Sequence, residues 1–324
     1  MPYLTTDDFS EAYSKLRQRG LSFLASKFSW AAQARTRSAF DDVGLQAANW
    51  WIIPAVRQRW NQLITGDPDL PYEPYFMQQH LDGKTGLRLL SLGSGICSHE
   101  LTFAQSPHFD RVVCVDIAGN LLKAAQAKAA QLGLQNMAFM EADLYQMDWP
   151  EGHYDVVLFH ASLHHFEAVE SLIRDKIKPV LRNGGLLLIN EYVGPNRLQF
   201  PPVQIQAINE ALRLIPAAYR RRFKTNVLKQ RVSGPGLWRM ILADPSECVD
   251  SAAIIPALHR HFEVLQERSY GGNLLMLALK DIAHHFVDPE PEARAALQRL
   301  FTSEDAYLQN HDSDFIYGVY RKNA

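Results

Sequence analysis

Short runs of consecutive hydrophobic residues begin at residue 87 and alternate with longer segments that have helical spacing. Such runs are typical of strands buried on both faces of a sheet, and helical segments between them indicate right-handed βαβ units. The pattern therefore predicts an α/β domain with a doubly wound, mostly parallel sheet. Its first five strands are expected in LRLLSL (87–92), RVVCV (111–115), NMAFM (136–140), YDVVLF (154–159) and GGLLLIN (184–190).

The segment before this domain has a helical pattern. Residues 9–28 and 38–64 place apolar side chains three and four positions apart, and TGDPDLP (65–71) ends the second helix. We interpret its tryptophans as packed core, with a substrate-facing aromatic wall as the alternative: Trp30, Trp50, Trp51 and Trp60.

The strand rhythm stops after Asn190, and residues 203–223 have helical spacing. Strand character returns at 261–270 and 315–322, with helical segments between. We therefore expect an N-terminal helical cap over 1–85, a ligand-binding core over 86–190, an acceptor-side helical insertion over 191–261, and C-terminal strands and helices over 262–324 that complete the core.

The 324-residue chain has 33 basic and 35 acidic residues, which argues against binding nucleic acid over its whole surface. The sequence starts without a basic and apolar leader, and no stretch has the roughly 18 uninterrupted apolar residues of a membrane-spanning helix. Cys97, Cys114 and Cys248 lack CxxC spacing, so we expect neither a disulfide framework nor a cysteine zinc site, and a cytoplasmic location.

The first predicted strand leads directly into Gly93, Ser94 and Gly95, and a helix is expected from Ser98. Glycine at such a turn lets the backbone approach a ligand closely, and the helix start favours a nucleotide-like or carboxylate-bearing group. The loop alone does not identify the ligand, because any tight strand-to-helix turn can use glycine. A GxGxxG dinucleotide pattern would require glycine at Ser98.

Two acids follow the next two strands. Asp116 ends the second strand, where a carboxylate can accept hydrogen bonds from both ribose hydroxyls or cap the next helix. Asp143 follows the third strand, where an acid can accept from an adenine amine or be a solvated turn residue. Together with the glycine loop, the two acids favour a nucleoside ligand.

The order and spacing of five segments resemble the successive motifs of class I S-adenosylmethionine-dependent methyltransferases: LLSLGSGICSHEL, VVCVDIAGNLL, MEADLYQMDW, YDVVLFHASLHHF and LRNGGLLLINEYV. The resemblance covers residues 86–193 and the closing strands. It implies S-adenosyl-L-methionine as cofactor and a seven-stranded sheet in the order 3-2-1-4-5-7-6, with 315–322 as an inserted antiparallel strand. The sequence departs from the family's pattern at Cys97, where a third glycine is frequent, and at Ser91, where many members carry an acid.

The resemblance also implies which residues contact the cofactor. The glycine loop would lie against its methionine and ribose, the acid after the second strand would hold the ribose, and the segment after the third would contact adenine. The implied cofactor-binding residues are Gly93, Ser94, Gly95, Asp116, Ile117, Asp143, Leu144, His160 and Ala161.

An acceptor hydroxyl must lose its proton during methyl transfer, and histidine suits a general base near neutral pH. His164 and His165 follow the fourth strand and are the predicted bases. Glu191, after the fifth strand, is predicted to orient a histidine, to substitute as base or to hold sugar hydroxyls, and Tyr192 and Arg197 are predicted to bind the acceptor. We expect no metal, because the histidines lie at a strand end without a third ligand nearby.

Residues 211–243 contain eight basic residues and no acidic one. This excess can attract an anionic acceptor, although most such runs are solvated helix faces. We expect the acceptor to enter between the N-terminal helices and residues 191–240.

EYVGPNRLQF (191–200) and TGDPDLPYEPYF (65–76) resemble a bacterial branch of the family often found near glycan and polysaccharide biosynthesis genes. This resemblance favours methyl transfer to a hydroxyl oxygen of a small-molecule or glycan acceptor. Carbon or nitrogen methylation, a NAD-dependent oxidoreductase and a noncatalytic subunit with the cofactor fold are the alternatives.

Overall fold

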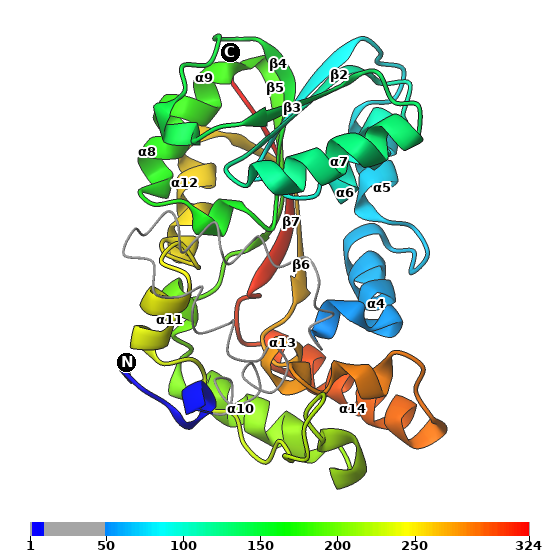
Figure 1. Cartoon of the computed structure of the whole chain (residues 1–324), viewed down its shortest axis with the longest axis vertical. Coiled ribbons are helices and arrows are strands. Elements are labelled where there is room, and N and C mark those ends of the chain that lie inside the picture. The colour runs from blue at the N-terminus through cyan, green and yellow to red at the C-terminus, as the bar shows by residue number, and fades with distance from the viewer. Residues whose placement is uncertain (1, 10–48, 324) are drawn as a thin grey trace. The chain divides into compact units, whose positions relative to one another are not determined.

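The computed structural model describes residues 2–9 and 49–323, and within this part of the chain seven strands form one sheet (Figure 1). The strand order β3-β2-β1-β4-β5-β7-β6 confirms the predicted topology. The strands are β1 (Leu87–Leu92), β2 (Phe109–Asp116), β3 (Met137–Glu141), β4 (Tyr154–His160), β5 (Leu181–Tyr192), β6 (Glu263–Gly271) and β7 (Phe315–Arg321).

The first five strands pair in parallel, with Leu90 of β1 opposite Val113 of β2 and Val157 of β4. β7 runs against β5: the backbone N–H of Lys322, just after the end of β7, donates to the carbonyl of Gly185 near the start of β5. Because parallel strands end at the same edge of a sheet, the residues that follow β1, β2, β4 and β5 are brought to one edge.

Contacts divide the chain into two compact units, and the first is named here the sheet unit. It comprises Asn61–Val193, Cys248–Ser269 and Ile316–Ala324. Apolar residues of β4 and β5 are fully buried together with residues of α12. The helices of this unit are α5 (Tyr72–His80), α6 (Ser98–Ala104), α7 (Gly119–Gln131), α8 (Val169–Leu172), α9 (Lys178–Val180) and α12 (Ile254–His261).

The second unit, named here the helical unit, comprises Met1–Trp60, Gly194–Glu247 and Tyr270–Phe315. Trp50 is buried and packs edge-on against Trp60, with ring centroids 4.6 Å apart. Residues of α10, α13 and α14 complete this core. The described helices that contribute to the unit are α4 (Pro54–Thr65), α10 (Pro202–Arg213), α11 (Leu237–Ala243), α13 (Leu275–Leu279) and α14 (Pro291–Leu308).

Several details differ from the expectations. Helices α13 and α14 belong to the helical unit, because Leu275 and Leu297 are buried in the same cluster as Trp50. The helix expected over 203–223 ends at Arg213, shortly before Pro216.

The tryptophans of the expected cap that the structure describes differ in their burial. Trp50 and Trp60 lie in a core, whereas Trp51 is 52% exposed. Trp30 and the helix expected over 9–28 lie outside the described residues apart from Phe9. Among the helices that are described, none is both long enough and apolar enough to cross a bilayer.

Candidate active site

The loop between β1 and α6 is shaped by left-handed backbone. Gly93 and Gly95 have φ of +69° and +52°, and Cys97, at the position of the frequent third glycine, has φ of +56° and is buried. A Cβ on Gly93 would lie 2.6 Å from Cβ of Ser162, so this position requires glycine. A Cβ on Gly95 would meet nothing within 4 Å, so the backbone there faces open space.

The carboxylate of Asp116 joins this loop to the end of β2. Its Oδ2 accepts from the N–H of Gly95 and its Oδ1 from the N–H of Ala118, both at 2.7 Å. Asp116 and the following Ile117 are only partly buried. Because each carboxylate oxygen has a second acceptor site, Asp116 can hold the loop and still accept hydrogen bonds from a ligand.

The segment after β3 forms a short 3-10 turn, Leu144–Gln146. Asp143 accepts at Oδ1 from the N–H of Tyr145, at 3.0 Å, and Leu144 is buried. Asp143 therefore caps this turn, and its contact with adenine stays a prediction.

A cluster of polar rings lies at the carboxyl end of β4. The hydroxyl of Tyr72 is 2.9 Å from Nδ1 of His160, and the ring of His99 stacks on His160 with centroids 3.5 Å apart. The Oε1 of Glu73 is 2.5 Å from Nδ1 of His99. Ala161 follows with a left-handed backbone and an exposed side chain.

The pKa values of the two histidines in this cluster are shifted in opposite directions. Burial lowers the pKa of His160 well below its ordinary value, and the neighbouring His99 and His164 lower it further. Burial also lowers the pKa of His99, but the hydrogen bond and charge of Glu73 and the charge of Glu100 outweigh it, so the pKa of His99 is raised. A neutral imidazole is thus stacked against one that holds its proton more strongly.

The sequence interpretation did not select Tyr72, Glu73 or His99. Two signals were present: His99 is the second residue of the helix that follows the glycine loop, and Tyr72 and Glu73 start the helix that follows TGDPDLP. Neither signal predicts that these residues meet His160, because the contact joins three segments distant in the chain.

Glu191 is the centre of a buried network at the ends of β4 and β5. Its Oε1 accepts from the backbone N–H groups of Ser162 and Leu163, both at 2.5 Å. Its Oε2 is 2.7 Å from Nδ1 of His164 and accepts from the N–H of Tyr192 at 3.2 Å. Glu191 is fully buried, so neither of its oxygens is exposed to an acceptor, and its role in orienting His164 stays a prediction.

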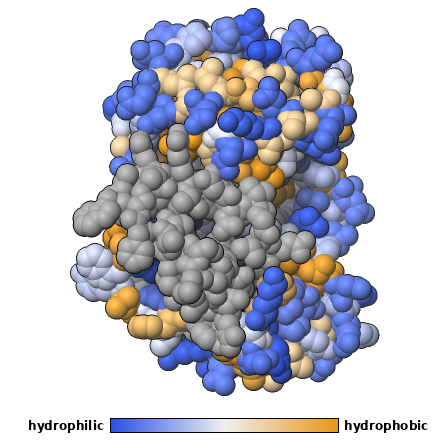
Figure 2. Space-filling view, viewed as in Figure 1, coloured by the Kyte–Doolittle hydropathy of each residue, from blue (hydrophilic) through white to orange (hydrophobic). Residues whose placement is uncertain are grey.

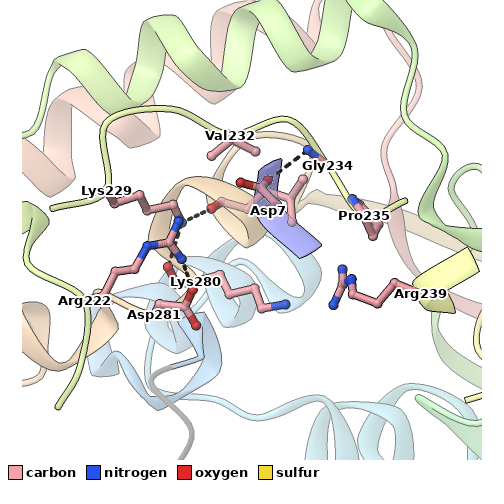
Figure 3. Close-up of a pocket in the computed structure, with 10 residues that line it drawn as sticks. Asp7, Arg222, Lys229, Val232, Gly234, Pro235, Arg239, Lys280 and Asp281 are labelled. Atoms are coloured by element: carbon pink, nitrogen blue, oxygen red, sulfur yellow. Dashed lines mark hydrogen bonds and ion pairs between the residues drawn. The ribbon is translucent and has the colours of Figure 1, made fainter. Parts of the chain in front are cut away.

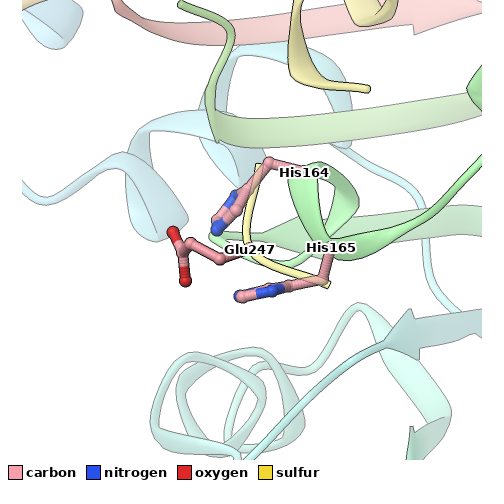
Figure 4. A group of neighbouring side chains, drawn as sticks. All are labelled: His164, His165 and Glu247. Atoms are coloured by element: carbon pink, nitrogen blue, oxygen red, sulfur yellow. The ribbon is translucent and has the colours of Figure 1, made fainter. Parts of the chain in front are cut away.

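His164 and His165 extend from the 3-10 turn Leu163–His165, as Figure 4 shows. Their ring centroids are 4.3 Å apart, and Glu247, drawn in the same view, belongs to the helical unit. His164 is buried with Nδ1 against Glu191, whereas His165 is more exposed. The contact with Glu191 makes His164 the stronger candidate of the two predicted bases, and the role of each stays a prediction.

Tyr192 and Arg197, the residues predicted to bind the acceptor, belong to different units. Tyr192 is buried at the end of β5. Arg197, in the helical unit, has φ of +56° and donates from Nη1 to the carbonyls of Pro245 and Glu247. Arg197 therefore holds its own unit's backbone together, and both acceptor assignments stay predictions.

Ser91, where many family members carry an acid, has a buried acid beside it. Its hydroxyl donates to Oε1 of Glu100 at 2.5 Å, and burial raises the pKa of Glu100. The acidic side chain beside this position therefore belongs to α6, whereas many family members carry an acid on the first strand itself.

Residues 90–189 match a family model described as methyltransferase domain. The uncharacterized methyltransferase YcgJ of Bacillus subtilis (strain 168) is 24% identical over 127 residues, which cover 39% of this chain and 47% of that protein. The ubiquinone/menaquinone biosynthesis C-methyltransferase UbiE of Pseudomonas syringae pv. syringae (strain B728a) is 30% identical over 139 residues, covering 42% of this chain and 53% of that protein. The chain thus spans about half the length of these curated relatives.

Among solved structures, the chain is similar to the Haemonchus contortus phosphoethanolamine N-methyltransferase 2 in complex with S-adenosyl-L-methionine. The TM-score is 0.50 and the identity 14%, covering 87% of this chain and 61% of that one. This likeness concerns the fold alone.

Proposed function

We propose that the chain is a class I S-adenosylmethionine-dependent methyltransferase that transfers a methyl group from S-adenosyl-L-methionine to a hydroxyl oxygen of a small-molecule or glycan acceptor. The observation that carries this proposal is the contact of Nδ1 of His164 with Oε2 of Glu191 at the carboxyl edge of the sheet. That arrangement supplies a base for a hydroxyl proton.

The residues at the glycine loop fit the cofactor. The backbone at Gly95 borders open space, and Asp116 keeps acceptor capacity and partial exposure beside it. Gly93, Gly95 and Asp116 would hold the nucleoside and methionine parts, with Asp143 and Leu144 toward adenine and His160 toward the methionine. The bound cofactor supplies an activated methyl group.

His164 would act as the general base. A buried carboxylate at Nδ1 fixes the imidazole tautomer with its proton on Nδ1, which makes Nε2 the basic nitrogen. Three backbone N–H groups also donate to Glu191, which fixes this carboxylate beside the imidazole. Glu191 would therefore stabilise the imidazolium that forms when His164 takes a proton, as a positioning residue.

Carbon methylation is the second candidate, because relatives at 30% identity are named C-methyltransferases. A carbon acceptor also loses a proton, so the same base would serve. The two candidates differ in the bond that forms, and the product distinguishes them.

The test has two parts. Calorimetry should detect binding of S-adenosylhomocysteine in the micromolar range, and tighter binding of NAD would contradict the class of enzyme proposed. Incubation with ¹³C-methyl S-adenosylmethionine and a panel of sugars, phenols, carboxylates and quinols, followed by NMR, should then give an O-methyl signal. A C-methyl signal instead would replace the first candidate by the second.

A further inference from the structure

A small pocket in the helical unit collects charged residues from three segments of the chain (Figure 3). Its volume is about 30 Å³, more than the roughly 10 to 15 Å³ that one water molecule needs. Four basic and two acidic side chains line it: Arg222, Lys229, Arg239, Lys280, Asp7 and Asp281. Arg222, Lys229 and Arg239 belong to the basic stretch 211–243, for which the sequence favours a solvated helix face.

Lys229 is the most buried of these cations, at 3% exposure. Its Nζ donates to the carbonyls of Leu277 at 2.5 Å and Lys280 at 2.6 Å. An ammonium group has three N–H donors, so one remains without a partner among the described residues. No carboxylate of the described chain is paired with this buried charge.

Arg222 is also buried and lines the same pocket. Its Nη1 forms an ion pair with Oδ2 of Asp281, but its Nε has no hydrogen-bond partner in the described part of the chain. A buried N–H without an acceptor costs about 1 to 3 kcal/mol. The pocket therefore offers two donors, on Lys229 and Arg222, that an oxygen-rich anion would satisfy.

Asp7 adds an acceptor to the same lining. Its Oδ2 accepts from the N–H groups of Ser233 and Gly234 at 2.8 and 3.0 Å, and its Oδ1 accepts no hydrogen bond from the described residues. A fitting ligand group must therefore be an anion that can also donate a hydrogen bond. A phosphate group can keep one proton near neutral pH at a small free-energy cost, because its second pKa of about 6 lies close to that pH, whereas sulfate carries no proton there.

We propose that this pocket binds a phosphate group, either as the free ion or as a monoester on a small molecule. Phosphate oxygens would accept from Lys229 and Arg222, and the P–OH would donate to Asp7. Arg239, which also lines the pocket, is paired with Asp8 through Nε and adds to the positive field. This site goes beyond the methyl transfer proposed above and does not depend on it.

The pH dependence follows from Lys229. Burial lowers its pKa to about 7; Asp281 and Asp7 raise it, and Arg222 and Lys280 lower it. A bound anion favours the charged ammonium, so binding above pH 7 should take up a proton. Affinity should fall as the pH rises from 6 to 8.5, because both Lys229 and the phosphate then lose protons.

Calorimetry on the full chain at pH 7 tests the site with inorganic phosphate, glucose 6-phosphate and sulfate. At least one phosphate probe should bind at least ten times more tightly than sulfate. Tighter binding of inorganic phosphate would identify the free ion as the ligand, and tighter binding of glucose 6-phosphate would identify a phosphate monoester. Lys229→Met and the double change Arg222→Gln with Asp281→Asn should each weaken phosphate binding at least tenfold. The matched variants of the exposed Lys224→Met and Arg221→Gln should stay within twofold of the wild type.

Two results would overturn the site: no binding of either phosphate probe by the wild type, or equal losses in the pocket variants and their exposed controls. Sulfate binding as tight as phosphate would overturn the assignment to phosphate. Asp7→Asn keeps the test usable if the buried cations are needed for folding. It should bring the affinities for phosphate and sulfate within about threefold of each other.

Discussion

Two carboxylates lie in the last residues of strands at the same edge of the sheet and accept hydrogen bonds from backbone N–H groups, yet their surroundings differ. Asp116 accepts two such bonds and is partly exposed, whereas Glu191 accepts three, contacts His164 and is fully buried. Burial and the number of donors therefore separate a carboxylate that can contact a ligand from one that positions another residue. The predictions below test this difference.

The largest expected effect is on the rate of the His164→Gln variant. Glutamine keeps hydrogen bonding but removes the base, and loss of a general base typically costs about a hundredfold to ten-thousandfold in rate. Single-turnover kinetics with an acceptor that the wild type methylates would measure it, and the cofactor affinity should stay nearly constant.

His165→Gln is the comparison variant, because His165 is the neighbouring histidine on the same turn and is more exposed than His164. Its rate should remain within about tenfold of the wild type. Near-normal rates in both variants would remove the catalytic assignment and leave the cofactor site untouched.

The second-largest expected effect is a loss of stability in the Glu191→Ala variant. Glu191→Ala leaves three backbone donors and one imidazole without their acceptor in a buried site, so the free energy of unfolding should fall by about 3 to 5 kcal/mol. Urea denaturation would measure it. Asp116→Ala removes two partly exposed bonds and should cost about 1 to 3 kcal/mol; an equal loss in both variants would contradict the difference between the two carboxylates.

Asp116→Ala should act chiefly on binding. We expect affinity for S-adenosylhomocysteine to fall more than tenfold, since hydrogen bonds to a charged group contribute about 1.5 to 3 kcal/mol each. Calorimetry would measure the change. An unchanged dissociation constant would remove the ribose assignment and leave Asp116 as a loop support alone.

The smallest effect concerns pH. The pKa of His99 is raised in the folded protein, so its contribution to stability is complete below the unfolded pKa of about 6.5 and is lost as the pH rises through the folded value. His99 is partly exposed, so the effect should stay below about 1 kcal/mol. The stability difference between wild type and His99→Gln should be larger at pH 6 than at pH 8.5 in urea titrations; a constant difference would contradict a charged His99.

Resemblance to a family supplied the strand order, whereas the local sequence was enough to predict the succession of buried strands, the glycine loop and the acid at the end of β2. These features depend on neighbouring residues: a buried strand runs directly into Gly93, and the next strand directly into Asp116. Resemblance to a family supplied the antiparallel last strand, which hydrophobic pattern alone places at the C-terminus without a direction.

Only the tertiary structure decided which polar residues meet and which are buried. Glu191 takes its partners from residues 162–164 and 192, His160 takes its own from residues 72 and 99, and the pocket of Lys229 is lined from residues 7, 222–239 and 277–281. Burial changes the role of a charged side chain because a group removed from water must be paired or shift its pKa. That environment is set by segments distant along the chain. From the sequence alone, Glu191 is therefore predicted only as a polar residue at a strand end and Lys229 only as a solvated cation.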